Sequence, residues 1–587
     1  QDYPYTGVLQ AAFKMFYYNR CNAPKEAPYA AANWTDGDNF NHPGQDFQCR
    51  FIFAAGSAST EKDLSGGWFD AGDYNKYVTF TYDVLHNLLA AYTLNPDLFG
   101  DNWRIPESGN GFPDLLDEVK WELDWLLKMV NPDGSTHIKM GSRNHEDNSH
   151  SPPSINTDPR YYGPTCTSAS ATVASTFAHA ALVFGNITGW EDYAGQLLTV
   201  AESAFAYVLP YANANALQTD CDDGSIVAGD ADRNADDQIG NLLSAAVYLY
   251  ELTGNDSYHQ FLLGHAGSQA PLSNNFWGPY RMPLQDALLH YTTLPGAQEA
   301  LRNSILTSAT TTVMNNWNGF FGFDDAALYR DVMPEWSYHW GSNNVKASYG
   351  NLNLLMAQHG IYPDADELYL RAEELLHAFH GVNPMGIVYL SNMYEYGATY
   401  SVNELYHLWF NDQTPYDHAL DSPLGPAPGY VVGGPNKDFS PNNPSPPAGQ
   451  PPAKSFRDWN TGWPENSWEI TEPAIYYQAA YLRLLTAIMG QRGFTDPATA
   501  TQPEPRTIAE VHLWPNPATD QVFLQAPAGA YRILLSDSQG RVLLQSNQHQ
   551  PTEPLSLRPL PAGAYHVRII RQTDQHSWNQ WLMKVGQ

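Results

Sequence analysis

From residue 1 to about residue 490, apolar residues recur every three or four positions, which is the spacing of amphipathic helices. Segment 113–130 is the clearest case, and Pro113 suits a first helical turn. The same pattern predicts seven more helices, at 172–184, 192–208, 237–252, 298–316, 351–358, 364–380 and 472–489. Strand patterns are sparse in this region. We therefore predict one all-α domain over residues 1–490, built of helices packed on helices.

The pattern changes after residue 490. Residues 491–507 are rich in Pro, Thr, Ala and Gln, which is typical of a linker. Residues 508–587 then alternate apolar and polar positions in short runs, which predict strands at 511–513, 521–525, 531–537, 541–545, 555–557, 565–571 and 578–585. This pattern predicts a small all-β sandwich as the C-terminal domain.

Composition narrows the classes of ligand. The chain has 30 Lys and Arg against 62 Asp and Glu, a net charge of −32, which repels nucleic acid and anionic lipid. Charged residues make up 16% and aromatic residues 13%. The high share of aromatic residues is explained either by a ligand that stacks on aromatic rings, such as a sugar, or by a large aromatic core. No apolar run predicts a membrane span, and no signal region precedes Gln1, so we interpret the chain as a mature secreted form.

Two aspartates, Asp70 and Asp73, stand three residues apart in a glycine-rich segment. Close like charges raise one pKa and suit a pair to proton transfer. An Asx-turn, a helix cap and a calcium ligand explain the same motif. Far downstream, Glu472 follows Thr471, and we expect it in the first turn of a helix that Thr471 caps. A glutamate there offsets the helix dipole, but aromatic neighbours such as Tyr477 also suit a carboxyl group kept protonated as an acid.

These residues belong to a series of motifs in a fixed order along the chain. The motifs are Gly-Trp-Phe-Asp-Ala-Gly-Asp-Tyr at 67–74, Phe-Pro-Asp-Leu-Leu-Asp-Glu at 112–118, Trp-Gly-Ser-Asn at 340–343, Gly-Val-Asn-Pro at 381–384, Gly-Gly-Pro-Asn at 433–436 and the segment around Glu472. Through them, residues 5–490 resemble the glycoside hydrolase family 9 cellulases. The resemblance implies an (α/α)6 barrel with an open cleft and inverting hydrolysis of β-1,4-glucosidic bonds.

The resemblance also implies roles for single residues. Asp73 would be the general base, Asp70 would help to hold the attacking water, and Glu472 would protonate the leaving oxygen. An inverting enzyme needs such an acid and base on opposite faces of the sugar. Tyr477 matches a tyrosine that the family places beside the acid.

Further candidates for sugar binding are aromatic. Trp68, Tyr338 and Trp340 are candidates for stacking on sugar rings, although core packing explains each of them as well. The family commonly has a His-His-Arg element after the Asn-Pro motif, and the nearest equivalent here is 405–410, without the arginine. We predict that His407 faces a glucose hydroxyl, while a structural role stays open.

Metal ligands are suggested by an acidic run at 230–237 that precedes a helix. Calcium takes six to eight such oxygen ligands, and a solvated helix cap is the alternative. Some relatives in the family bind calcium at a corresponding helix start, which implies a structural calcium held by Asp232, Asp236, Asp237 and Asp286. We expect no organic cofactor, since acid–base hydrolysis needs none and no glycine-rich phosphate loop is found.

Four cysteines fit two disulfides in a secreted chain, and the sequence leaves their pairing open. In some similar cellulases, cysteines in the region of Cys21 and Cys49 are followed by histidine and bind zinc. Here Arg50 takes that following position, so we do not expect zinc. We prefer a Cys21–Cys49 disulfide, with Cys166–Cys221 as a second one.

The tail also resembles a known family. Trp-Pro-Asn-Pro-Ala at 514–518, Gly-Arg-Val-Leu at 540–543, Leu-Pro-Ala-Gly-Ala-Tyr at 560–565 and the terminal Lys584-Val585 are similar to the C-terminal sorting domain of type IX secretion substrates. The alternative is a carbohydrate-binding module, which is also a small β-sandwich. No clear row of surface aromatic residues favours that alternative.

We therefore predict a secreted or cell-surface endo-β-1,4-glucanase. Its partners would be a β-glucan polysaccharide and a secretion machinery, with no nucleic acid and no membrane span. One rival is a catalytically silent glucan-binding protein. Another is an enzyme of the same fold that acts on xyloglucan, mixed-linkage glucan or chito-oligosaccharides. The sequence does not decide whether the enzyme acts at internal bonds or processively, and it does not give the oligomeric state.

Overall fold

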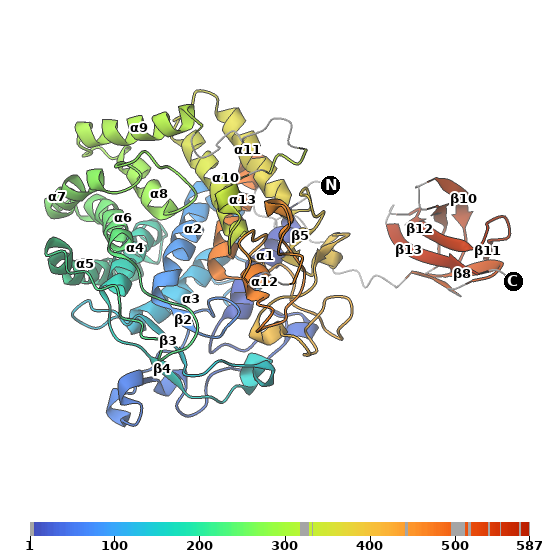
Figure 1. Ribbon diagram of the computed structural model, residues 1–587, viewed down its shortest axis with the longest axis horizontal. Coiled ribbons are helices and arrows are strands. Elements are labelled where there is room, and N and C mark those ends of the chain that lie inside the picture. Colours follow the sequence, from blue (N-terminus) through green and yellow to red (C-terminus); the bar gives the residue numbers. More distant parts are fainter. Residues whose placement is uncertain are drawn as a thin grey trace. The chain divides into compact units, whose positions relative to one another are not determined.

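The protein consists of two compact units, residues 1–500 and 501–587, which are described separately here. The computed structural model describes residues 5–585 apart from 317–327, 332, 441–443, 495–510, 515–517, 527, 538–540, 552 and 574–576. The boundary between the units falls within the predicted linker, 491–507. Figure 1 shows helices in the first unit and a smaller set of strands in the second.

Six helices of the first unit form a closed inner ring. Each contacts the next in the order α2, α4, α6, α8, α10 and α13, and α13 contacts α2 again. Their bounds are α2 Thr81–Leu94, α4 Thr167–Phe184, α6 Ala235–Thr253, α8 Met282–Tyr291, α10 Ser342–Gln358 and α13 Ile475–Gln491. These helices are buried nearly all round, as in α4, where only Leu182 is not buried. They form the core of the barrel.

Six further helices surround this ring. Five of them lie against the inner helix that precedes them in the chain, and the first, α1, lies against the last inner helix, α13. They are α1 Thr6–Asn19, α3 Asp114–Met129, α5 Glu191–Asn213, α7 Asp256–His265, α9 Glu299–Met314 and α11 Ala365–Phe379. Their outer faces are polar, which is the pattern of amphipathic helices. The described residues thus form an (α/α)6 barrel, as predicted. Because inner and outer helices alternate, all inner helices begin at one end of the barrel.

Each of the eight predicted helices corresponds to a helix of the structure, although several of their ends differ. Prediction 113–130 corresponds to α3, and 237–252 corresponds to α6. Helices α1, α2, α7 and α8 were missed. Helix α10 begins nine residues before its predicted start. Like α2, it is buried on almost every side and shows little contrast between faces.

The predicted helix at 472–489 begins too early. Helix α13 starts at Ile475, while Glu472 has extended backbone angles (φ −68°, ψ 125°) after the short helix α12, Trp468–Thr471. Glu472 precedes Pro473, and a residue before proline is disfavoured in helical conformation. Thr471 therefore caps no helix here, and Glu472 is not a first-turn residue.

Short strands in the loops of the first unit form two small sheets. One has the order β1 Arg50–Phe51, β4 Arg160–Tyr162, β3 Lys139–Ser142 and β2 Lys76–Tyr77. The other pairs β5 Val388–Ser391 with β6 Ser401–Val402. The first of these sheets fixes the segment that follows Asp70 and Asp73.

The second unit consists of two sheets around a small apolar core. One sheet has the order β10 Val542–His549, β9 Tyr531–Ser536, β12 Gly563–Arg571 and β13 Ser577–Lys584. The other has the order β11 Pro554–Ser556, β8 Gln521–Gln525 and β7 His512–Trp514. Alternate residues of β9 and β12, among them Ile533 and Val567, fill the core between the sheets. All seven strands lie close to their predicted positions.

One of the two predicted disulfides is present. Cys166 and Cys221 are bonded, whereas Cys21 and Cys49 are free buried thiols, so the preferred Cys21–Cys49 pairing was wrong. The sulfur atom of Cys21 donates instead to a carboxylate oxygen of Asp46 at 3.1 Å. Burial raises the pKa of the Cys21 thiol to about 12, so the thiol stays protonated.

Candidate active site

Asp70 and Asp73 lie in a tight turn that precedes β2. The backbone N–H of Asp70 donates to the carbonyl of Asn75 at 3.1 Å, which closes the turn. Asp73 Oδ2 accepts hydrogen bonds from the Tyr77 hydroxyl at 2.8 Å and from Asn75 Nδ2 at 3.0 Å. The Oδ1 atoms of Asp70 and Asp73 are buried, and neither has a hydrogen-bond partner within the described residues. Two carboxylate oxygens are therefore left for a ligand such as water.

Backbone hydrogen bonds join this turn to the segment of Glu472. The N–H of Ile475 donates to the Asp70 carbonyl at 2.9 Å, and Gly72 N–H donates to Glu472 Oε1 at 3.2 Å. Gly433 N–H donates to the Glu472 carbonyl at 3.0 Å. A Cβ at Gly72 would lie 2.9 Å from Glu472 Oε1 and 2.5 Å from the Tyr406 carbonyl, so only glycine allows this close approach. The carboxyl group of Glu472 thus meets those of Asp70 and Asp73, from which it is far removed in sequence, at the end of the barrel where α13 begins.

The environment of Glu472 favours its neutral form. Burial, with a smaller contribution from the charge of Asp73, raises the pKa of Glu472 to about 8. Burial also raises the pKa of Asp70 well above its usual value, and the charges of Asp73 and Glu472 add to this effect. At neutral pH, Glu472 is consequently mostly protonated.

Asp73 is buried as well, and desolvation raises its pKa. Its hydrogen bonds from Tyr77 and Asn75 oppose that effect, because they stabilise the carboxylate. The acid and the base candidates thus differ in their environments: Glu472 accepts one long hydrogen bond, and Asp73 accepts two shorter ones.

We expect Tyr77→Phe to shift the acidic limb of the pH profile. A base must be ionised, so activity falls as the pH decreases through the pKa of Asp73. Removing the hydroxyl donor makes the carboxylate less stable and raises that pKa, so the acidic limb moves to higher pH. The basic limb, set by Glu472, stays in place. The measurement is kcat/KM between pH 4 and pH 9, and an unshifted acidic limb would contradict the role of Tyr77.

Three predicted sugar-binding residues, Trp340, Tyr477 and His407, have different surroundings: Trp340 is exposed, whereas Tyr477 and His407 are buried. Trp340 is 49% exposed. Tyr477 lies beside the acid, since the charge of Glu472 acts on its hydroxyl, and an added Cβ at Gly341 would lie 2.8 Å from its oxygen. His407 is buried, and its Nδ1 accepts from the Trp409 N–H at 3.1 Å. Its Nε2 must then carry the proton, and within the described residues it has no partner.

Two other predicted stacking residues belong to the core. Trp68 is 1% exposed, packs against Phe16, and donates from Nε1 to Glu118 at 2.8 Å. Tyr338 is buried in a small cluster with Val345 and Leu375. The prediction that Trp68 and Tyr338 stack on sugars was therefore wrong, because their rings are covered by protein.

The four predicted calcium ligands do not form one site. Asp286 makes a two-point ion pair with Arg483 at 2.6 and 2.7 Å, and Asp237 pairs with Arg281 at 2.7 Å. Asp232 accepts N–H groups of Cys221 and Asp222, and Asp236 accepts only a long contact from Gln269 at 3.5 Å. Within the described part of the chain, the ligand atoms of these four residues do not all lie within 4.8 Å of one another. Their donor set does not fit a calcium ion.

Among the described residues, Cys21 and Cys49 belong to no cluster of three ligand atoms that could hold a metal ion. The carboxylate of Asp46 beside them is already paired with Lys76 at 3.0 Å and Arg160 at 3.1 Å. The positive charges of Lys76 and Arg160 therefore already balance the negative charge of the Asp46 carboxylate.

Sequence reasoning missed the residues that support the carboxyl groups. Asn75 and Tyr77 follow Asp73 by two and four residues. Their side chains could therefore have been predicted from the sequence as hydrogen-bond donors to Asp73. Tyr406, whose ring packs against Trp468 near the acid, gave no comparable signal. Its contact with the Glu472 segment, from its N–H to the Thr471 carbonyl at 3.3 Å, depends on the tertiary fold.

An (α/α)6 barrel that brings a buried, protonated carboxyl group close to a hydrogen-bonded carboxylate is suited to hydrolysis by acid–base catalysis. The family model for glycosyl hydrolase family 9 matches residues 5–485. The chain therefore belongs to glycosyl hydrolase family 9, and it is an inverting glycoside hydrolase.

Named relatives agree with this assignment. Endoglucanase D of Acetivibrio thermocellus is 25% identical over 512 residues, which cover 84% of this chain and 70% of that protein. A xyloglucan-specific endo-β-1,4-glucanase of Bacteroides ovatus is 27% identical over 495 residues, which cover 82% of this chain and 78% of that protein.

A solved structure shows the same fold. The crystal structure of a metagenome-derived family 9 endoglucanase aligns with a TM-score of 0.66 at 25% identity, covering 82% of this chain and 80% of that one. The predicted barrel is thereby confirmed.

The C-terminal unit matches a second family model, the secretion system C-terminal sorting domain, at residues 512–583. The sorting-domain prediction is thus confirmed, and the protein is secreted or displayed on the cell surface. Among the helices that the structure describes, none is long and apolar enough to cross a membrane.

Proposed function

We propose that the protein is an endo-β-1,4-glucanase that cleaves internal β-1,4-glucosidic bonds of cellulose or a related β-glucan. In this proposal Glu472 protonates the leaving oxygen, Asp73 takes a proton from the attacking water, and Asp70 holds that water. The water attacks the anomeric carbon as the glucosidic bond breaks, so the anomeric configuration inverts.

One observation carries the proposal, namely the unequal environment of the two carboxyl groups. Burial raises the pKa of Glu472 to about 8, whereas Tyr77 and Asn75 stabilise the carboxylate of Asp73. An acid and a base are therefore available at the same pH. The unpaired Oδ1 atoms of Asp70 and Asp73 offer two acceptors for the protons of one water molecule.

The polysaccharide is tested by comparing soluble substrates. We expect carboxymethyl cellulose to lose viscosity rapidly while few reducing ends appear, since internal cleavage shortens chains quickly. Xyloglucan and mixed-linkage glucan are assayed in parallel, because a relative is named for xyloglucan. Slow viscosity loss with abundant reducing sugar would contradict endo action. An inactive wild type on all three would refute the proposal and direct the search to chito-oligosaccharides or a binding function.

A further inference from the structure

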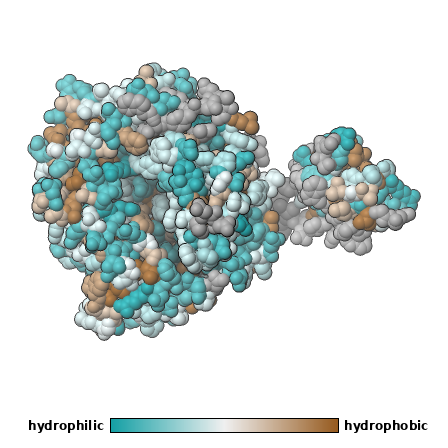
Figure 2. Space-filling view, viewed as in Figure 1, coloured by the Kyte–Doolittle hydropathy of each residue, from teal (hydrophilic) through white to brown (hydrophobic). Residues whose placement is uncertain are grey.

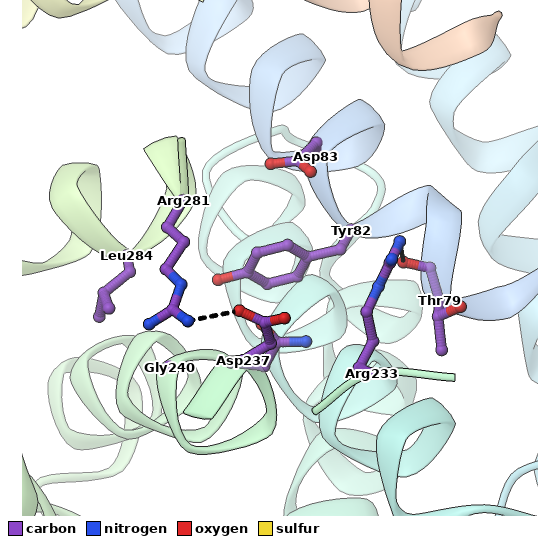
Figure 3. A pocket seen from close by; sticks show the side chains of 9 residues that line it. Thr79, Tyr82, Asp83, Arg233, Asp237, Gly240, Arg281 and Leu284 are labelled. Carbon is purple, nitrogen blue, oxygen red and sulfur yellow. Dashed lines mark hydrogen bonds and ion pairs between the residues drawn. The ribbon is translucent and has the colours of Figure 1, made fainter. Parts of the chain in front are cut away.

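A polar pocket, whose lining residues are drawn in Figure 3, opens at the N-terminal ends of three inner helices. Its cavity measures about 180 Å3. Residues at or just before the N-terminal ends of α2, α6 and α8 line most of it, and these ends lie together because the inner helices run in one direction. The lining residues are Thr79, Tyr82, Asp83, Arg233, Asp237, Gly240, Asn241, Arg281 and Leu284.

The charged groups of this pocket fall into a paired set and an unpaired set. Arg281 and Asp237 form an ion pair at 2.7 Å, drawn as a dashed line in Figure 3. Arg233, in contrast, makes a single hydrogen bond with the described residues, a long one to the Thr79 carbonyl at 3.4 Å. The carboxylate of Asp83 has no hydrogen bond or ion pair with any described residue. A guanidinium donor and a carboxyl acceptor are therefore left in one cavity.

This pocket lies close to the reacting groups. The guanidinium of Arg233 lies over the ring of Phe80 at 4.9 Å, and Phe80 stacks on Tyr77 at 4.7 Å between ring centroids. Tyr77 is the residue that donates to Asp73. One aromatic ring thus separates Arg233 from the residue that supports the base. A glucan chain bound across Asp73 is within reach of the pocket.

The chemistry of the pocket suits a neutral sugar. Its two arginines and two aspartates cancel in charge, and they present both donors and acceptors, as sugar hydroxyls require. The Tyr82 ring forms part of the wall, so a C–H face also has an apolar surface to contact (Figure 3). An anion would meet the carboxylates of Asp83 and Asp237, which disfavour it.

We propose that this pocket is a sugar-binding subsite, in which Arg233 donates to, and Asp83 accepts from, the hydroxyls of one neutral pyranose unit of a β-glucan. This inference rests on the function proposed above. The pyranose is either a glucose of the main chain or a sugar branch attached to it, and both present the same hydroxyl chemistry. The subsite makes Asp83 and Arg233 specificity-determining residues that are distinct from the catalytic ones.

The test compares long and short substrates. Asp83→Ala is expected to lower kcat/KM about 10-fold to 100-fold on a substrate that reaches the pocket, the loss typical of a hydrogen bond to a charged group. On a short aryl β-cellobioside, which is cleaved next to Glu472, kcat/KM stays within about twofold. Cellohexaose and a xyloglucan oligosaccharide are the two long substrates. A loss on cellohexaose assigns the pocket to the main chain, and a loss on the xyloglucan oligosaccharide alone assigns it to a branch.

A second variant fills the pocket without removing a charge. Gly240 is helical, and a Cβ there would meet only Leu284, at 3.4 Å, so Gly240→Leu is expected to fold and to occupy the cavity. It should reproduce the loss on the same long substrate. The control is Gly195→Leu on α5, where an added Cβ would meet nothing within 4 Å, and it should leave all activities unchanged.

The possible failures can be told apart. Equal kcat/KM for wild type, Asp83→Ala and Gly240→Leu on both long substrates would overturn the subsite while the proposed function stands. Equal losses on long and short substrates would also overturn it, since they would indicate damage to the catalytic groups. A wild type inactive on every substrate, the aryl β-cellobioside included, would overturn the proposed function itself.

Discussion

Replacing Asp73 with asparagine is expected to lower kcat about 10²-fold to 10⁴-fold with little change in KM, because water then lacks its general base. The amide has the shape of the carboxylate, and its oxygen can still accept from the Tyr77 hydroxyl, so the turn should persist. The measurement is kcat and KM on cello-oligosaccharides together with the melting temperature, which shows whether the barrel remains folded.

The same variant offers a rescue experiment. Azide is a nucleophile that needs no base, so it should restore turnover of an activated aryl β-cellobioside by Asp73→Asn and form a glycosyl azide of inverted configuration. Asp63→Asn is the control, since Asp63 lies in the same loop region but bonds to Ser65 and Lys128. Near wild-type kcat in Asp73→Asn would refute the assignment of Asp73 as the base.

The sequence predicted best those features that depend on neighbours in the chain. The outer helix α3 and the seven C-terminal strands each show a regular contrast between apolar and polar faces, and they were placed within a few residues. The inner helix α2 lacks that contrast because it is enclosed by other helices. Periodicity is therefore a weaker guide to α2 than to α3.

The catalytic residues could be predicted because each lies in a short sequence motif. Their surroundings could not be predicted, because they depend on contacts between residues far apart in the chain. Residue type alone suggested that Trp68 stacks on sugar, but its burial under α1 and its bond to Glu118 depend on contacts distant in the sequence. Asp286 was an acceptable calcium ligand by type, and its pairing with Arg483, almost 200 residues away, decides otherwise. Partners, more than residue types, thus determine the role of a side chain here.

Glu472→Gln is expected to abolish hydrolysis of natural substrates to a similar extent, about 10²-fold to 10⁴-fold in kcat, because the leaving sugar is no longer protonated. The effect should depend on the leaving group. A dinitrophenyl β-cellobioside releases a stable anion that needs no proton, so the variant should cleave it nearly as fast as wild type. The basic limb of the wild-type profile, which reports the pKa of about 8, should also disappear with this substrate.

Glu469→Gln is the matched control for this variant. Glu469 lies three residues before Glu472, is also buried, and accepts hydrogen bonds from Asn436 and from the Ser440 N–H at 3.0 and 3.1 Å. Its carboxyl group thus has structural partners, and an amide oxygen can accept the same bonds, so activity should stay within about twofold of wild type. If Glu472→Gln instead lost activity equally on both leaving groups, Glu472 would act before protonation, by holding the substrate, and the acid would have to be sought among the other carboxyl groups.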